Sequence, residues 1–147
     1  TLYINLGDEY ADFSIGHFQM KPSFAETLIE KLWSQNDSVF QKIYKDRKAV
    51  EDKKIFRSGI IADLEDPGRQ FEYLMAFIKI CEKDYPVNIM PEEDEIRFLA
   101  AAYNCGLNKS ESYIWLMEGK KFFSTGLIKN DTYSYSDISL YWYLNNR

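Results

Sequence analysis

The sequence predicts one mainly α-helical domain spanning residues 1–147, with about six helices and a small β or loop element near its N-terminus. Apolar residues recur at spacings of three and four over most of the chain after residue 22. Proline and acidic residues mark several helix starts, and hydrophobic residues make up 46% of the chain, enough for a sizeable buried core. No repeat, low-complexity segment or linker divides the sequence.

Residues 1–20 mix aromatic, glycine and acidic residues without a helical period, which predicts a loop with one short strand or hairpin. A helix is expected to begin at Ser23, because Ser23 and Glu26 have the spacing of a capping box ahead of an apolar stripe. The mixed charges of 45–54 indicate an exposed helix turn or a connection, and a further helix is expected over about 49–64.

In the second half of the sequence, prolines and a glycine delimit the helices. Asp66-Pro67 starts a strongly apolar helix that runs to Tyr85. Pro91, which three acidic residues follow, starts the next helix, and Gly106 ends it. The remaining expected elements are a helix over 110–120, a turn at Gly126 and Asn130-Asp131, and a last helix over 136–147 capped by Ser136 or Asp137.

Composition and charge exclude several classes of function. The net charge of −5 and the pI near 5.0 argue against nucleic acid as the main partner. No apolar run approaches the roughly 18 residues that a membrane span needs. His17 is the single histidine and no histidine–cysteine cluster has metal spacing, so we expect neither a metal site nor a cofactor. Cys81 and Cys105 are expected to be free, mostly buried thiols.

Aromatic residues make up 16% of the chain, which is a high share. Most are expected in the core, while some can line a sugar-binding cleft, because Tyr and Trp combine an apolar face with a polar tip. For the aromatic segment 133–146 we favour packing on the core; the alternatives are an extension of a sugar groove and a contact with another chain.

The first of two notable motifs places Gly16, Gln19, Pro22 and Ala25 at intervals of three. Glycine permits a close approach of the backbone to a ligand or a positive φ, and glutamine offers both a donor and an acceptor, which suits a sugar. Proline fixes the turn, and alanine lets the start of the helix pack closely. Taken alone, the motif predicts only a junction between a loop and a helix.

The second motif, Ala100–Gly106, has the sequence AAAYNCG. Its three alanines allow close helix packing, and Gly106 suits a helix end. Tyr103 and Asn104 lie near that end, where side chains can reach a cleft. Taken alone, a packing face with a glycine cap is the simpler interpretation.

Together the two motifs resemble those of the lytic transglycosylase and goose-type lysozyme superfamily, whose members carry G-L-M-Q-x-x-P-x-x-A and, many residues later, A-A-Y-N-x-G. The corresponding segments here are GHFQMKPSFA, Gly16–Ala25, and AAYNCG, Ala101–Gly106. Between them, residues 71–85 resemble the family helix in which a Tyr-Leu pair recurs. The resemblance covers roughly residues 10–118. The departures from the family pattern are mild: His17, Phe18 and Cys105.

The resemblance implies a lysozyme-like fold and a bacterial enzyme exported to the periplasm or cell envelope. The implied substrate is the glycan strand of peptidoglycan, cleaved at the β-1,4 bond between N-acetylmuramic acid and N-acetylglucosamine. Gln19, Tyr103 and Asn104 are the implied cleft residues. Further substrate contacts are expected from Ser14, Gly16, Phe18 and Met20, while His17 is either a polar sugar contact or an ordinary surface residue.

In this family the catalytic glutamate lies roughly fifteen or more residues before the first motif. We therefore expect the general acid to precede Thr1, in a sequence trimmed at its N-terminus, since it does not begin with Met. Glu9 is the fallback within the chain, shielded by neighbouring rings. Asp8 or Asp12 would be the second carboxylate that places a water, so hydrolase and transglycosylase chemistry both stay open.

Two further interpretations belong to other functional classes. A catalytically silent glycan-binding or envelope scaffold module would keep the fold without the acid. An all-helical interaction domain would carry both motifs by chance. The acidic trio Asp63, Glu65 and Asp66 looks like a catalytic pair, but its place just before Pro67 is explained by the favourable interaction of acids with a helix N-terminus.

Overall fold

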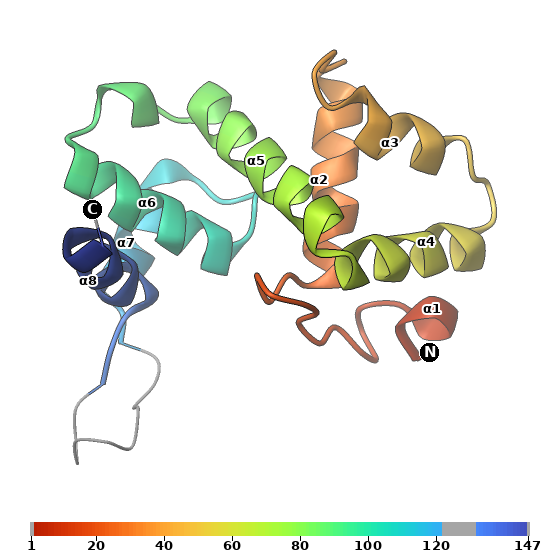
Figure 1. Cartoon of the computed structure of the whole chain (residues 1–147), viewed down its shortest axis with the longest axis horizontal. Coiled ribbons are helices and arrows are strands. Elements are labelled where there is room, and N and C mark those ends of the chain that lie inside the picture. The colour runs from red at the N-terminus through yellow and green to blue at the C-terminus, as the bar shows by residue number, and fades with distance from the viewer. Residues whose placement is uncertain (1, 122–131, 147) are drawn as a thin grey trace. The chain divides into compact units, whose positions relative to one another are not determined.

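The computed structural model describes residues 2–121 and 132–146, and it confirms that the protein is mainly α-helical (Figure 1). These residues form eight α-helices and one short 3-10 helix. They contain no β-strand, and an isolated antiparallel bridge pairs Ile15 with Met20. The turn expected at Gly126 and Asn130-Asp131 and the final residue of the last expected helix, Arg147, lie outside the described residues.

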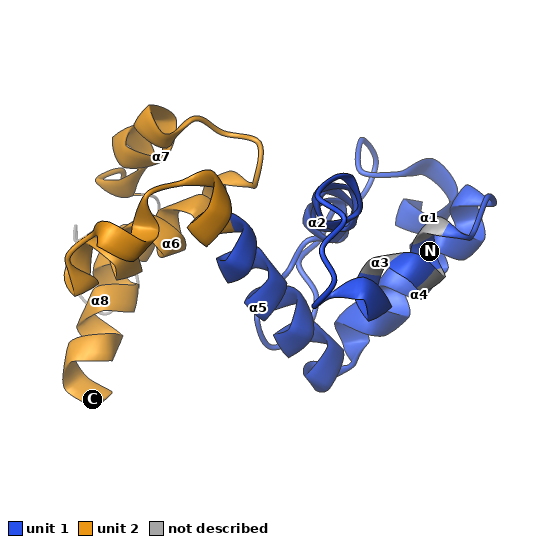
Figure 2. Ribbon diagram, turned by 90° about the horizontal axis from the view of Figure 1, so that it is seen from above, with its two compact units in different colours: residues 1–80 blue, residues 81–147 orange. Residues whose placement is uncertain are grey.

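The chain forms two compact units, residues 1–80 and residues 81–147, which Figure 2 shows in two colours. Helix α5, Pro67–Asp84, begins in the first unit and ends in the second. Each unit has its own buried apolar residues.

The first unit contains α1 (Leu2–Leu6), α2 (Pro22–Ser34), α3 (Gln41–Lys48), α4 (Lys53–Glu65) and most of α5. Helix α2 packs against α3 and α4, and α1 packs against α4. The apolar stripe of α2 is buried as its spacing predicts, and Phe24 of α2 contacts the ring of Phe77 of α5. Helix α1 was not expected, because five residues are too few to show a helical period.

Two expected helix starts are wrong. Helix α2 begins at Pro22, whose fixed φ suits the first helical position, and the expected capping box is absent because Ser23 and Glu26 bond elsewhere. Helix α4 begins at Lys53 rather than near residue 49, because Asp52 accepts hydrogen bonds from the backbone N–H groups of the first turn.

The second unit contains the end of α5, the 3-10 helix η1 (Val87–Ile89), α6 (Glu92–Cys105), α7 (Glu111–Glu118) and α8 (Tyr135–Asn146). Helix α6 packs against α7 and α8, and its buried Phe98 contacts the rings of Tyr85 and Trp115. The expected end of α6 is confirmed, since Gly106 follows its last residue with a φ of +90°. Its start lies one residue later than expected, because Pro91 is the N-cap and Glu92 the first helical residue.

The cap of α8 is Ser134, not Ser136 or Asp137, because the Ser134 Oγ accepts a hydrogen bond from the backbone N–H of Asp137. The expected core packing of the aromatic segment 133–146 is wrong in part. Leu140 is buried, but Tyr141 and Trp142 have 71% and 65% of their surface exposed. Neither cysteine of the described residues is in a disulfide, and Cys81 is buried while Cys105 is half-buried. None of the described helices combines the length and apolar character needed to cross a membrane.

Candidate functional site

Gly16 and Gln19 of the first motif lie on the loop Asp12–Lys21, which leads into α2 and which we call the motif loop, while Pro22 and Ala25 lie in the first turns of α2. Side-chain contacts close its two ends. The backbone N–H of Ser23 donates to Oδ1 of Asp12 at 3.0 Å, and the Ser23 hydroxyl donates to Oδ2 at 2.6 Å. Asp12 therefore does from outside the helix what an N-cap residue does, and it fixes the loop to the start of α2.

The centre of the motif loop is a tight turn over Ile15–Met20. The two end residues exchange backbone hydrogen bonds of 2.9 and 3.1 Å. Gly16 has a φ of +70° and Gln19 a φ of +50°, so both occupy the left-handed region, as the sequence suggested for Gly16. The Gln19 side chain donates from Nε2 to the carbonyl oxygen of Gly16 at 2.7 Å, which ties the side chain to its own turn.

Gln70 of α5 holds this turn from the protein side. Its side chain is fully buried, and its Nε2 donates to the carbonyl oxygens of Ile15 at 2.7 Å and Leu64 at 2.6 Å. Its Oε1 accepts from the backbone N–H of Phe18 at 3.1 Å. A Cβ on Gly16 would lie 1.9 Å from the Gln70 Nε2, so the turn needs glycine for space as well as for φ.

Sequence reasoning missed Gln70. The signal was present: a single glutamine stands three residues before Tyr73 and seven before Phe77, on the stripe of α5 that is buried in the first unit. A polar residue on such a stripe must find hydrogen-bond partners, but the sequence does not show that the partners lie on the motif loop.

The motif loop exposes some of the expected contact residues and buries others. Ser14 and Gln19 are exposed, as are Phe13 and His17, and Gly16 is exposed on the side that faces away from Gln70. Phe18 is half-buried. Met20 is fully buried, so it contributes to the core and has no surface to offer a ligand. Ala25 is also fully buried, which agrees with the close packing expected of it.

The carboxylates of the first unit have well-defined partners. Glu26 accepts hydrogen bonds from the hydroxyl of Tyr3 and from the guanidinium of Arg57, which also lies over the Tyr3 ring. Burial, followed by the hydrogen bond to Glu26, raises the pKa of Tyr3 above its ordinary value. Glu9 and Asp8 are exposed in the turn after α1, so Glu9 lacks the apolar setting expected of a general acid.

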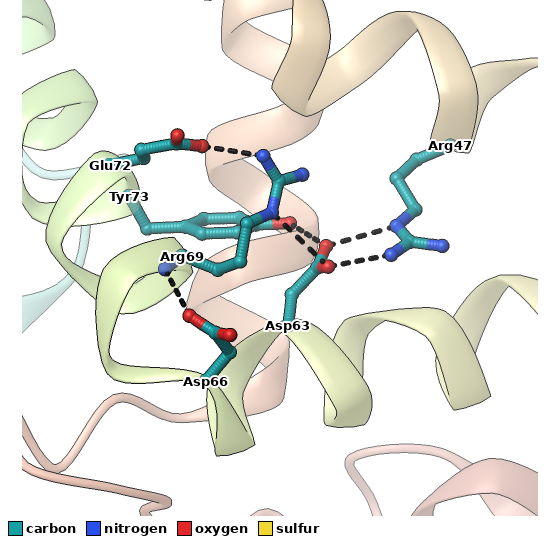
Figure 3. Close-up of polar contacts among 6 residues, drawn as sticks. All are labelled: Arg47, Asp63, Asp66, Arg69, Glu72 and Tyr73. Atoms are coloured by element: carbon teal, nitrogen blue, oxygen red, sulfur yellow. Dashed lines mark hydrogen bonds and ion pairs between the residues drawn. The ribbon is translucent and has the colours of Figure 1, made fainter.

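Asp63 is a buried carboxylate that contacts three side chains of the first unit (Figure 3). Arg47 of α3 donates to both of its oxygens, at 2.7 and 3.0 Å, and the Tyr73 hydroxyl donates at 2.9 Å. Arg69 adds a longer contact of 3.4 Å. Burial, followed by the charge of Asp63, raises the pKa of Tyr73, and the hydrogen bond to Asp63 raises that of Arg47.

The acidic trio therefore divides into different roles. Asp66 accepts a hydrogen bond from the backbone N–H of Arg69 at 2.8 Å, so it caps α5, which begins at Pro67 as the sequence predicts. Asp63 is explained instead by its arginine and tyrosine partners, and Glu65 is exposed.

The second motif lies in the second unit, on the last turns of α6. Ala101 and Ala102 are buried, which confirms a close-packed face. Tyr103 is half-buried, and burial raises its pKa to about 12; the Asn104 side chain is exposed. The motif loop belongs to the first unit. Over residues 2–121 and 132–146, no group of three His, Cys, Asp or Glu side chains is placed to hold a metal ion.

No protein-family model, curated protein or solved structure matches this chain. The two motifs and the geometry of the residues around them are therefore the features from which a function can be inferred.

Proposed function

We propose that this chain is a lysozyme-like, peptidoglycan-cleaving glycosidase of the bacterial envelope, acting on the β-1,4 bond between N-acetylmuramic acid and N-acetylglucosamine. In this proposal the motif loop binds the glycan strand. The supporting observation is the turn over Ile15–Met20, whose backbone is held by Gln70 while the side chains of Ser14, His17 and Gln19 are exposed.

The chemistry of the motif loop suits a sugar. One N–H of the Gln19 amide donates to Gly16, and an amide has a second N–H and a carbonyl oxygen that can serve a hydroxyl or acetamido group. Phe13, with 78% of its surface exposed, offers an apolar face on which a sugar ring can pack. A pre-ordered loop loses little entropy when it binds a ligand, which favours affinity.

Cleavage also requires a general acid, and this requirement favours a second candidate function. A general acid of a glycosidase is a carboxyl group that keeps its proton in an apolar setting. Asp12, Glu26 and Asp63 instead accept hydrogen bonds from backbone, hydroxyl or guanidinium donors, and Glu9 is exposed. None of these four carboxylates has the apolar setting of a general acid. The second candidate function is a catalytically silent glycan-binding module, in which the motif loop acts alone.

A digest of purified sacculi separates the two candidates. Muropeptides released by the full-length protein are identified by mass spectrometry. Products with 1,6-anhydromuramic ends indicate a lytic transglycosylase, and reducing ends indicate a lysozyme. Sacculi that are bound but not cleaved indicate the binding module. If the protein neither binds sacculi nor releases muropeptides, both candidates are contradicted.

A matched pair of variants tests the role of the motif loop in the same assay. Gln19→Ala is expected to weaken binding to sacculi about 5- to 10-fold, the effect of losing one or two neutral hydrogen bonds. Gln41→Ala removes a glutamine of α3 that bonds to Lys45 and is expected to bind as the wild type does. Equal binding by both variants contradicts a role for Gln19.

A further inference from the structure

We infer that Gln70 is the positioning residue of the motif loop: it is expected to touch no ligand, but it sets the backbone conformation in which Gln19 and its neighbours meet the glycan. This inference rests on the proposed function for its ligand. The contact between Gln70 and the loop is independent of that ligand and can be measured without it.

The hydrogen bonds of Gln70 determine the orientation of its amide. One N–H of Nε2 is directed at Leu64, whose carbonyl oxygen belongs to the last turn of α4, where carbonyl groups lack partners within the helix. The other is directed at Ile15, at the beginning of the turn. With both donors used, the Oε1 is left to accept from Phe18, inside the turn.

The turn and the amide also fit each other by shape. Gly16 lies directly against the Gln70 Nε2, and its missing Cβ leaves the space that the amide fills. The left-handed φ of Gly16 directs the Ile15 carbonyl and the Phe18 N–H to the same side chain. A side chain of α5 thus sets the backbone conformation of the exposed turn.

Glutamine is the side chain that meets all of these requirements. Methionine has a similar length but neither donates nor accepts strongly, so it would lose all three hydrogen bonds that the Gln70 side chain makes. Glutamate can accept from Phe18 but, when ionised, places its charge against the carbonyl oxygens of Ile15 and Leu64. Both substitutions are expected to release the turn while leaving the apolar packing of α5 in place.

The test compares Gln70→Met with Ile60→Val, a cavity-forming change in the buried core of α4 that lowers the stability of the same unit without removing a hydrogen-bonding group. Amide hydrogen exchange is followed by NMR in the full chain without ligand. Binding to purified sacculi is measured in parallel. Gln70→Glu is the second variant, in case Gln70→Met does not fold.

In Gln70→Met, the amides of Phe18 and Met20 are expected to exchange at least about tenfold faster, while the amides of α2 and α5 change no more than they do in Ile60→Val. Binding to sacculi is expected to fall about tenfold in Gln70→Met and by less than about twofold in Ile60→Val.

Three outcomes are decisive. Loop exchange that is no faster in Gln70→Met than in Ile60→Val overturns the inference. Loop-specific exchange with unchanged binding also overturns it, because the conformation held by Gln70 would then not serve the ligand. If the wild type binds no sacculi while the loop-specific exchange is seen, the proposed function fails and the contact between Gln70 and the turn is upheld.

Discussion

Asp63 and Gln70 are both buried polar residues at the corner between α4 and α5, yet they stabilise different parts of the first unit. Asp63 is charged and is held by side chains from α3 and α5, so it joins helices to one another. Gln70 is neutral, and two of its three partners are backbone groups of the motif loop. The same corner thus supports the helical fold through one residue and the exposed turn through the other.

The chemical types of the two residues follow from what they bind. Guanidinium and hydroxyl groups are donors, and a carboxylate accepts from all of them at once. A turn of backbone offers both a carbonyl and an N–H, and an amide matches that mixture with a single neutral group. Removing Asp63 should therefore lower the stability of the fold, while removing Gln70 should chiefly change the loop.

The largest effect is expected for Asp63→Ala. It leaves Arg47 and Arg69 near each other without their shared carboxylate, and unpairing a buried ion pair costs about 3–5 kcal/mol. Because the two arginine side chains keep 22% and 29% of their surface exposed, we expect about 3 kcal/mol, measured by urea unfolding.

Asp66→Ala is the matched control, since it removes a carboxylate from the same corner but only a helix cap, at about 1 kcal/mol. Equal losses of stability in the two variants would show that Asp63 stabilises the fold no more than a carboxylate that caps a helix.

The sequence predicts those parts of the fold that depend on neighbouring residues. Pro67 at a helix start, Asp66 as its cap and Gly106 at a helix end each act through their own backbone, so their type and position suffice. The buried stripe of α2 follows in the same way from its period.

What the sequence could not predict depends on contacts between distant residues. The cap of α2 comes from Asp12, eleven positions before Ser23, and it displaces the local capping box. The partner of Asp63 on α3 lies sixteen positions away. For the candidate site, the left-handed backbone at Gly16 could be predicted, because glycine adopts that conformation readily. The support from Gln70, 55 positions beyond Ile15, could not.

The loop side of the comparison is tested by Gly16→Ala. The substitution strains a left-handed backbone, at about 1–2 kcal/mol, and its Cβ displaces the Gln70 amide and weakens hydrogen bonds of about 1 kcal/mol each. We expect a loss of about 2–3 kcal/mol, measured by urea unfolding, with the fastest amide exchange in the motif loop. A loss below about 0.5 kcal/mol would mean that neither the strain nor the contact is significant.

A smaller effect on stability is expected for Gly59→Ala in α4, and its sign is expected to depend on Arg47. A Cβ there would lie 2.1 Å from the Arg47 Nη1, and the guanidinium cannot retreat without leaving Asp63. We expect Gly59→Ala to cost about 1 kcal/mol of unfolding free energy, less than a full charge-assisted hydrogen bond because alanine favours the helix.

In an Arg47→Ala background the obstacle is gone, and the same substitution should stabilise by about 0.5–1 kcal/mol. A double-mutant cycle in urea measures both values. A cost that persists without Arg47 would place the cause elsewhere in α4.

The smallest effect is expected in the second unit, where the charges of the Asp63 cluster are reversed: one cation, Arg97, contacts two carboxylates, Glu118 and Asp137, each at 2.9 Å. The hydrogen bond from Arg97, followed by that with Ser134, lowers the pKa of Asp137 below its ordinary 3.8. A carboxyl group whose pKa is lower in the folded state stabilises the fold above its unfolded pKa, and that stabilisation is lost as the pH falls through the folded pKa.

Because 42% of the Asp137 side chain is exposed, solvent screens the pair, and Asp137→Asn should cost less than about 1 kcal/mol at pH 7. The difference from the wild type should shrink as the pH falls from 7 through the folded pKa of Asp137, because the carboxyl group then takes up a proton and becomes neutral, as asparagine is. Urea unfolding over this pH range measures it. A loss of stability as large as that of Asp63→Ala would mean that the greater exposure of the Arg97 cluster does not weaken it relative to the Asp63 cluster. The number of charged contacts would then matter more than their burial.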